Sequence, residues 1–139
     1  MPAISVERTI AATKRAVLGG LIRYNGEKLG RQKHRRFAIS LREKEKIVGG
    51  IVGEVWMSVL FIQFFWIEER FRGKGHGKAL IEKIEDQARK FGAVRSYLDT
   101  LSVQAPEFYR ACGYQEIERM DVPTPGGVSV PITRMGKPL

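Results

Sequence analysis

Residues 59–78 read VLFIQFFWIEERFRGKGHGK, and they contain the strongest structural signal of the chain. Its first nine residues are apolar except for Gln63 and are rich in β-branched and aromatic side chains. This composition favours a strand buried on both faces over a helix. Gly73, Gly75 and Gly77 follow, and the apolar residues after them recur at helical spacing. The stretch therefore predicts a strand, a glycine-rich turn and a helix, an arrangement that can hold phosphate groups.

The same patterns predict the other elements of a mixed α/β (α+β) fold with a partly parallel sheet. Before residue 59 we expect a short strand over 4–8, a helix over 9–29 that breaks at Gly19–Gly20, and a hairpin of strands over 36–41 and 47–56. After the glycine-rich turn we expect a helix that ends at Phe91–Gly92, strands over 94–103, 114–122 and 128–135, and a short helix over 105–112.

The composition indicates one soluble domain over residues 1–139. Hydrophobic residues make up 43% of the 139 residues, enough for one core. The single cysteine, Cys112, excludes an internal disulfide framework, and with only His34 and His76 beside it we expect no metal site. No apolar run has the length of a membrane span, and the start of the chain does not resemble a secretory signal. We therefore expect a cytoplasmic protein that has no membrane partner.

The positive charge is concentrated in the first third of the chain. The net charge is +9, and residues 1–46 hold 12 of the 24 Lys and Arg but only 4 of the 15 Asp and Glu. Such a basic segment can bind nucleic acid or simply form a solvated face. Because no nucleic-acid-binding motif accompanies the charge, we favour the solvated face and do not expect nucleic acid as the partner.

The spacing of the glycines excludes two common phosphate-binding motifs. A P-loop would need glycine where Arg72 stands and Ser or Thr after Lys78, where the chain has Ala79. The dinucleotide pattern G-x-G-x-x-G fails from both Gly73 and Gly75. The pattern [RQ]-x-x-G-x-[GA] does fit, in one register that starts at Arg70 and in another that starts at Arg72.

On these residues the chain resembles the GNAT superfamily of N-acetyltransferases. The segment 70–78 resembles the acetyl-CoA pyrophosphate loop of that family, and 47–51 resembles its middle hairpin strand. Residues 98–100, 104–110 and 113–114 resemble its later strand and helix with the Phe-Tyr…Gly-aromatic signature. The resemblance implies a central mixed sheet of about six to seven strands flanked by helices and splayed near strands 4 and 5, the fourth being 59–67.

The resemblance also implies which residues bind acetyl-CoA. Backbone N–H groups of the loop would hold its pyrophosphate, and main-chain groups at the end of the 59–67 strand would pair with its pantetheine arm. Gln104 and Phe108 are further implied contacts, although Gln104 could equally cap the short helix. The loop and strand residues implied are Arg72, Gly73, Lys74, Gly75, His76, Gly77 and Lys78, together with Phe65, Trp66 and Ile67.

For catalysis, the resemblance places Tyr109 as the general acid that protonates the leaving CoA thiolate. The alternative is a tyrosine that only packs with Phe108 against the sheet. Glu54 and Asp99 are the carboxylates best placed to take a proton from the amine, and a water, or an amine already neutral, remains open. Cys112 is better explained as a small buried thiol than as a covalent nucleophile.

The function implied is transfer of an acetyl group from acetyl-CoA to a primary amine of a small molecule or peptide, directly within a ternary complex. The basic first third argues against a polycationic acceptor. Two alternatives are a non-catalytic acyl-CoA-binding module on the same fold and a basic nucleic-acid-binding protein. The oligomeric state is open, and a homodimer would be common in such a family.

Overall fold

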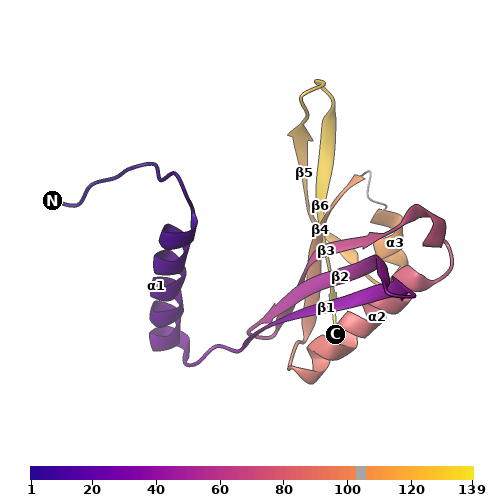
Figure 1. Ribbon diagram of the computed structural model, residues 1–139, viewed down its shortest axis with the longest axis horizontal. Coiled ribbons are helices and arrows are strands. Elements are labelled where there is room, and N and C mark those ends of the chain that lie inside the picture. Colours follow the sequence, from indigo (N-terminus) through magenta and orange to yellow (C-terminus); the bar gives the residue numbers. More distant parts are fainter. Residues whose placement is uncertain (103–105) are drawn as a thin grey trace. The chain divides into compact units, whose positions relative to one another are not determined.

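The computed structural model describes residues 1–102 and 106–139 (Figure 1). It divides into two compact units, Met1–Gln32 and Lys33–Leu139. The first unit contains helix α1 (Ala11–Leu29), and the second contains the strands and the remaining helices. The single domain predicted over residues 1–139 stays a prediction.

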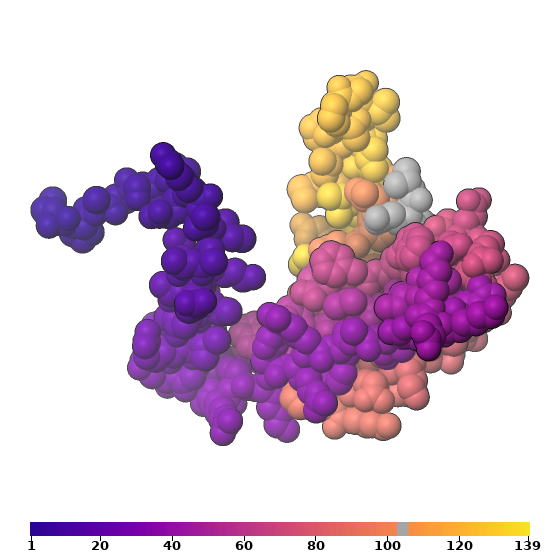
Figure 2. All heavy atoms as spheres, in the orientation of Figure 1, coloured from indigo at the N-terminus to yellow at the C-terminus, as the bar shows by residue number. Residues whose placement is uncertain are grey.

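The second unit is built on a mixed sheet that has six strands in the described part of the chain, in the order β1-β2-β3-β4-β6-β5. The strands are β1 (His34–Glu43), β2 (Lys46–Trp56), β3 (Val59–Ile67), β4 (Arg95–Leu101), β5 (Gln115–Pro123) and β6 (Ser129–Pro138). Neighbouring strands are antiparallel except β3 and β4, which are parallel. The predicted mixed, partly parallel sheet is therefore confirmed, and its β5–β6 hairpin projects from the unit (Figures 1 and 2).

Helix α2 (His76–Lys90) connects β3 to β4 and packs across β1 and β2. Its apolar side chains meet those of the sheet in one buried cluster, because they recur every three to four residues on one face. The members of the cluster include Ile51, Val55, Leu60, Leu80, Ile81, Ile84, Ala88, Leu98, Tyr109, Tyr114 and Met135. A short 3-10 turn, η1 (Glu69–Phe71), precedes α2, and α3 (Pro106–Ala111) lies between β4 and β5.

Two local predictions for the N-terminal segment are wrong. Residues 4–8 form no strand, because alternation alone does not make a strand without a partner to complete its hydrogen bonds. Helix α1 runs without a break through Gly19 and Gly20. Glycine lowers helix stability by about 1 kcal/mol per residue but does not force a break. The prediction treated a modest cost as a stop signal.

The predicted splay of the sheet lies between β3 and β4. In the described part of the chain these strands pair over Val59–Phe61 and Arg95–Tyr97, and no further pairing between them is found there. A bulge on β3 leaves Gln63 without a partner on β2, because Val52 pairs with Phe64 while Gly53 pairs with Ile62. Since the predicted strand over 4–8 is absent, the splayed strands are the third and fourth along the chain instead of the fourth and fifth.

Gly49 of β2 lies where the sheet has no room for a side chain. A Cβ at this position would lie 2.9 Å from the carbonyl oxygen of Trp66 and 3.1 Å from the Cα of Ile67. We expect Gly49→Ala to lower the free energy of unfolding by about 1–3 kcal/mol, because the β3 backbone must shift. Urea unfolding measures this loss, and Gly126→Ala, with no neighbouring atom within 4 Å, is the matched control. Equal stability of the two variants would contradict the expectation.

Candidate active site

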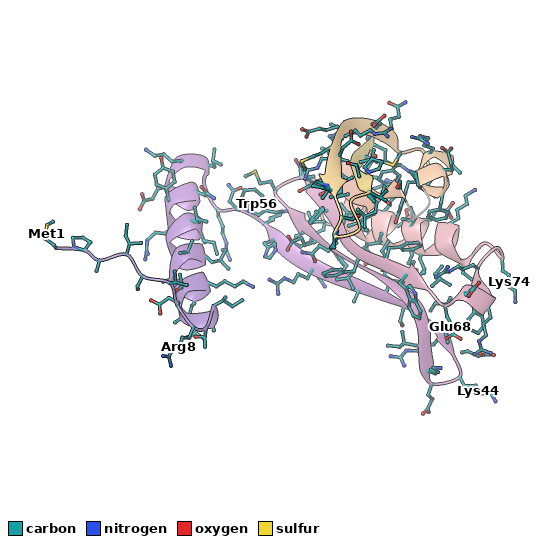
Figure 3. The ribbon with its side chains drawn as sticks, turned by 90° about the horizontal axis from the view of Figure 1, so that it is seen from above. Met1, Arg8, Lys44, Trp56, Glu68 and Lys74 are labelled. Carbon is teal, nitrogen blue, oxygen red and sulfur yellow. The ribbon has the colours of Figure 1, made fainter. Side chains whose placement is uncertain are left out.

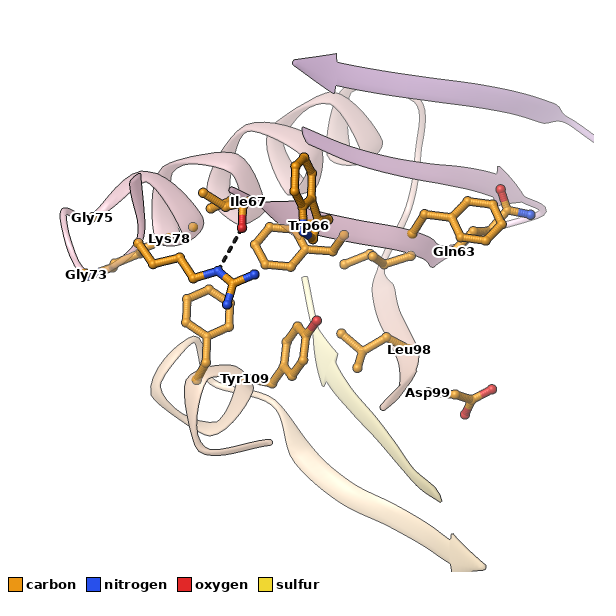
Figure 4. Close-up of a pocket in the computed structure, with 15 residues that line it drawn as sticks. Gln63, Trp66, Ile67, Gly73, Gly75, Lys78, Leu98, Asp99 and Tyr109 are labelled. Carbon is orange, nitrogen blue, oxygen red and sulfur yellow. Dashed lines mark hydrogen bonds between the residues drawn. The ribbon is translucent and has the colours of Figure 1, made fainter. Parts of the chain in front are cut away.

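A cavity of about 820 Å³ opens where β3 and β4 part (Figure 4). Its walls come from β3, the glycine-rich loop, the start of α2, β4 and α3, so that segments distant in sequence meet in one place. The lining residues are Ile62, Gln63, Phe64, Phe65, Trp66, Ile67, Arg72, Gly73, Gly75, Gly77, Lys78, Leu98, Asp99, Phe108 and Tyr109. The three strand residues implied to contact acetyl-CoA, together with Phe108, are among them.

The glycines of the loop have distinct structural roles. Gly73 and Gly75 have φ angles of +72° and +86°, a region that side chains rarely allow. Gly77 lies so close to Phe108 that a Cβ there would be 3.0 Å from two atoms of its ring. Gly75 is the N-cap of α2 and offers no capping side chain, so the first-turn N–H groups are available to an anion.

Of the two arginines that could begin the loop pattern, Arg72 lines the cavity and Arg70 does not. The Arg72 Nε donates a 2.7 Å hydrogen bond to the carbonyl oxygen of Ile67, which ties the loop to the end of β3 (Figure 4). Arg70 does not line the cavity and is paired with Glu68 and Glu43 instead. Arg72 therefore contributes charge to the cavity, whereas Arg70 braces the loop from outside.

Two other predicted loop residues lie outside the lining. Lys74 lies at the tip of the loop with its Nζ 5.9 Å from the centre of the Phe71 ring, and His76 is the half-buried first residue of α2. Gln104 lies outside the described residues.

Tyr109 directs a phenol into the cavity (Figure 4). The residue is only 7% exposed, and its ring packs edge-on against Phe65, Phe108 and Tyr114. Its hydroxyl has no hydrogen-bond partner within the described residues. Burial raises the pKa of Tyr109 to about 12, and Cys112 adds to the rise. The phenol therefore stays protonated and has its hydrogen free to donate.

The two carboxylates predicted as bases lie in different surroundings. Asp99 lines the cavity, and both of its oxygens accept hydrogen bonds from Arg134, at 2.9 and 3.0 Å. Glu54 is not part of the lining, and its carboxylate lies 2.9 Å from His34 Nε2 and 3.9 Å from Arg36 Nε. Asp99 and Tyr109 therefore line the same cavity and Glu54 does not, but the Asp99 carboxylate points away from Tyr109 (Figure 4).

Cys112 does not line the cavity. Burial raises the pKa of the Cys112 thiol, and Glu85 raises it further, while Lys137 and Lys78 act in the opposite direction. A raised pKa keeps the thiol protonated, and the thiol is a weaker nucleophile than the thiolate. This agrees with a packing role.

Several lining or supporting residues were missed in the sequence. Gln63 is noticeable as the polar residue of an apolar strand, but only the bulge turns it into part of the cavity wall. Arg134 carries no local signal, because its partner Asp99 is 35 residues away.

No group of His, Cys, Asp and Glu in residues 1–102 and 106–139 could hold a metal ion. No helix in these ranges has the length and apolar character needed to cross a membrane.

The fold and the site define a class of protein with a splayed mixed sheet and a glycine-rich loop at a helix N-terminus, and comparison with known proteins identifies the family. A model of the acetyltransferase (GNAT) family matches residues 13–114. The acetyltransferase Atu2258 of Agrobacterium fabrum is 30% identical over 108 residues, which cover 77% of this chain and 79% of that protein. The chain belongs to the GNAT family of acetyltransferases and is an acyltransferase.

Further relatives support the same assignment. The blasticidin-S acetyltransferase of Streptomyces morookaense is 38% identical over 74 residues, 52% of this chain and about half, 54%, of that protein. The crystal structure of a proposed acetyltransferase from Agrobacterium tumefaciens matches with a TM-score of 0.87 and 27% identity over 100% of both chains. An aminoglycoside 6′-N-acetyltransferase solved with coenzyme A shares the fold, with a TM-score of 0.63 and 18% identity over 74% of this chain and 72% of that one.

Proposed function

We propose that the chain transfers the acetyl group of acetyl-CoA to a primary amine of a small molecule or peptide, directly within a ternary complex. One observation carries the proposal. One continuous cavity extends from the glycine-rich loop to the gap between β3 and β4, and it contains the hydroxyl of Tyr109, which has no hydrogen-bond partner among the described residues.

The loop end of the cavity suits the pyrophosphate of acetyl-CoA. First-turn N–H groups of α2 and its dipole favour an anion, and the side chains of Arg72 and Lys78 add positive charge. Beyond the loop, the unpaired edge of β3 is free to bind an extended amide-bearing arm as another strand would. An acetyl donor is supported by the relatives described above, which are named as acetyltransferases.

Groups that line the cavity, together with solvent, account for each proton that moves during the transfer. The amine nitrogen forms the new C–N bond at the thioester carbonyl, the C–S bond breaks, and the sulfur takes a proton from the Tyr109 hydroxyl. The proton that the amine loses passes to Asp99 or to water, and solvent returns a proton to Tyr109. Holding the amine and the thioester in one cavity supplies most of the rate gain.

A thermal-shift titration with acetyl-CoA tests the proposal. At about 100 times its dissociation constant, acetyl-CoA should stabilise the protein by about 2.7 kcal/mol, because it binds only the folded state. NAD, ATP and a short DNA duplex should give no comparable shift. No response to acetyl-CoA, or a salt-sensitive response to DNA alone, would contradict the proposal.

Gly75→Ala tests the loop within the same titration. Forcing a side chain at φ +86° costs about 1–2 kcal/mol of stability and disturbs the N–H groups that face the phosphates. Gly92→Ala is the matched control, because Gly92 has φ +94° at the other end of α2. We expect similar losses of stability in both variants but loss of the acetyl-CoA shift only in Gly75→Ala. An equal acetyl-CoA shift in both would exclude the loop as the phosphate site.

A further inference from the structure

The cavity crosses the sheet. Side chains alternate along β3, and both sets line the cavity. Phe65 stacks on Phe108 of α3, and Ile67 is buried in the core, so these point toward the helices. Phe64 and Trp66 are 71% and 55% exposed and point to the opposite side, which we call the far face. A ligand can therefore enter from each side of the sheet where β3 and β4 part.

The far face beside this opening is aromatic. Phe61 and Tyr97 stack with their ring centroids 4.7 Å apart at the last paired position of β3 and β4. Phe64 and Trp66 follow along β3 at the mouth of the cavity. Exposed aromatic side chains gathered at a cavity mouth are typical of a binding site, and they favour a flat ligand that stacks on their rings.

One fixed carboxylate stands at the same mouth. Asp99 is the sole carboxylate among the described lining residues. Arg134 holds both of its oxygens, and the guanidinium of Arg134 lies 5.1 Å from the centre of the Tyr97 ring. Each carboxylate oxygen can accept more than one hydrogen bond, so Asp99 can still accept from an amine. Arg134 acts as a positioning residue that fixes Asp99 from β6, on the side of β4 away from β3.

We propose that the acceptor is a primary amine carried on a flat aromatic or heterocyclic body. Its body docks on the far face against Phe64 and Trp66, and its nitrogen donates to Asp99 as it enters the gap toward Tyr109. A polycation does not fit, because one carboxylate that is already paired with an arginine offers too little negative charge. This inference rests on the acetyl transfer proposed above and names its acceptor class.

Two amines of equal charge and similar size test the aromatic preference. The kcat/KM is measured for phenethylamine and for 2-cyclohexylethylamine with saturating acetyl-CoA, following release of the CoA thiol. We expect phenethylamine to be preferred by about three- to tenfold, the range that ring stacking adds beyond burial. Spermidine, the polycationic comparison, should be the poorest acceptor. Equal values for the first two amines, or a preference for spermidine, would overturn the inference.

Variants on the far face separate recognition from structure. Phe64→Leu should raise the KM for phenethylamine by about three- to tenfold, with less effect on 2-cyclohexylethylamine and none on the KM for acetyl-CoA. Trp56→Leu is the matched control, because Trp56 is exposed on the same face but does not line the cavity. Figure 3 shows Trp56 at the end of this unit remote from Glu68 and Lys74. Equal effects of the two variants would overturn the docking site.

Asp99→Asn distinguishes recognition from proton removal. We expect the KM for the amine to rise about tenfold, because the neutral amide accepts a hydrogen bond from the amine more weakly than the carboxylate does. The kcat should change little. A fall in kcat with unchanged KM would overturn the recognition role. The acetyl-CoA thermal shift is recorded in parallel. If that shift is absent, the proposed function fails; if it is present but only aliphatic amines are acetylated, the acceptor class alone fails.

Discussion

Tyr109→Phe is expected to lower kcat by about 10²–10⁴-fold, the usual contribution of a positioned general acid or base. The hydroxyl is the part of Tyr109 that lacks a partner within the described residues, while its ring is held by three aromatic neighbours. Phenylalanine keeps that packing and removes only the donor. Steady-state kinetics at saturating amine and acetyl-CoA measure the loss.

The binding of acetyl-CoA provides the control for this variant. Its thermal shift should be the same with Tyr109→Phe as with the native chain, because the glycine-rich loop that we propose to hold the phosphates is formed by other residues of the cavity. A kcat within about twofold of the native value would remove the acid role. Tyr109 would then be a packing residue, which is the alternative that the sequence leaves open.

The pH dependence of the unfolding free energy provides a second test of Tyr109. The pKa of Tyr109 is raised from 10.0 to about 12 in the folded protein, so the folded state holds this proton more tightly than the unfolded chain does. The resulting stability is fully present below pH 10 and is lost as the pH rises through 12. Tyr109→Phe should therefore reduce the alkaline loss of unfolding free energy in urea titrations. An unchanged alkaline loss would contradict this.

Lys137→Met is expected to lower the free energy of unfolding by about 3–5 kcal/mol, because it leaves a buried carboxylate without its charge partner. Glu85 is only 3% exposed, and Lys137 Nζ lies 3.1 Å from its carboxylate. Tyr114 donates a 2.8 Å hydrogen bond to the same carboxylate, and its hydroxyl lies 2.7 Å from that of Ser96. Lys137 also donates to the carbonyl oxygen of Cys112, just after α3.

A surface ion pair on α2, the helix that also carries Glu85, is the control. Arg89 and Asp86 form a 2.9 Å ion pair at exposed positions, so Arg89→Met should cost less than about 1 kcal/mol. The double variant Glu85→Leu with Lys137→Met should regain part of the loss, because a buried pair replaced by apolar side chains leaves no unpaired charge. Urea unfolding measures all three. A loss in Lys137→Met no larger than in Arg89→Met would contradict the expectation.

The sequence predicted the secondary structure around the cavity. The strand over 59–67 matches β3, and the glycines at 73 and 75 take the positive φ angles that make the loop. Helix α2 begins directly after them, as its apolar spacing predicts. Each of these features depends on residues a few positions apart, so that composition and periodicity within one segment are sufficient to indicate them.

The N-terminal segment shows the limit of local patterns. Alternation over 4–8 does not make a strand and the glycine pair does not break α1, since a strand needs a partner and a helix tolerates glycine at a modest cost. The same limit applies to the carboxylates. Glu54 and Asp99 are equivalent in sequence terms, but Glu54 is paired with His34 outside the cavity.

The order of strand, glycine-rich loop and helix and the family follow from the sequence alone, because both depend on short-range spacing and motifs. Only the tertiary structure decided where β3 and β4 part, that Gln63 bulges, and that Arg134 meets Asp99 across 35 residues of chain. It likewise decided that Lys137 meets Glu85 across 52 residues. Such contacts depend on strand register and on how elements pack, and neither is encoded in any single segment.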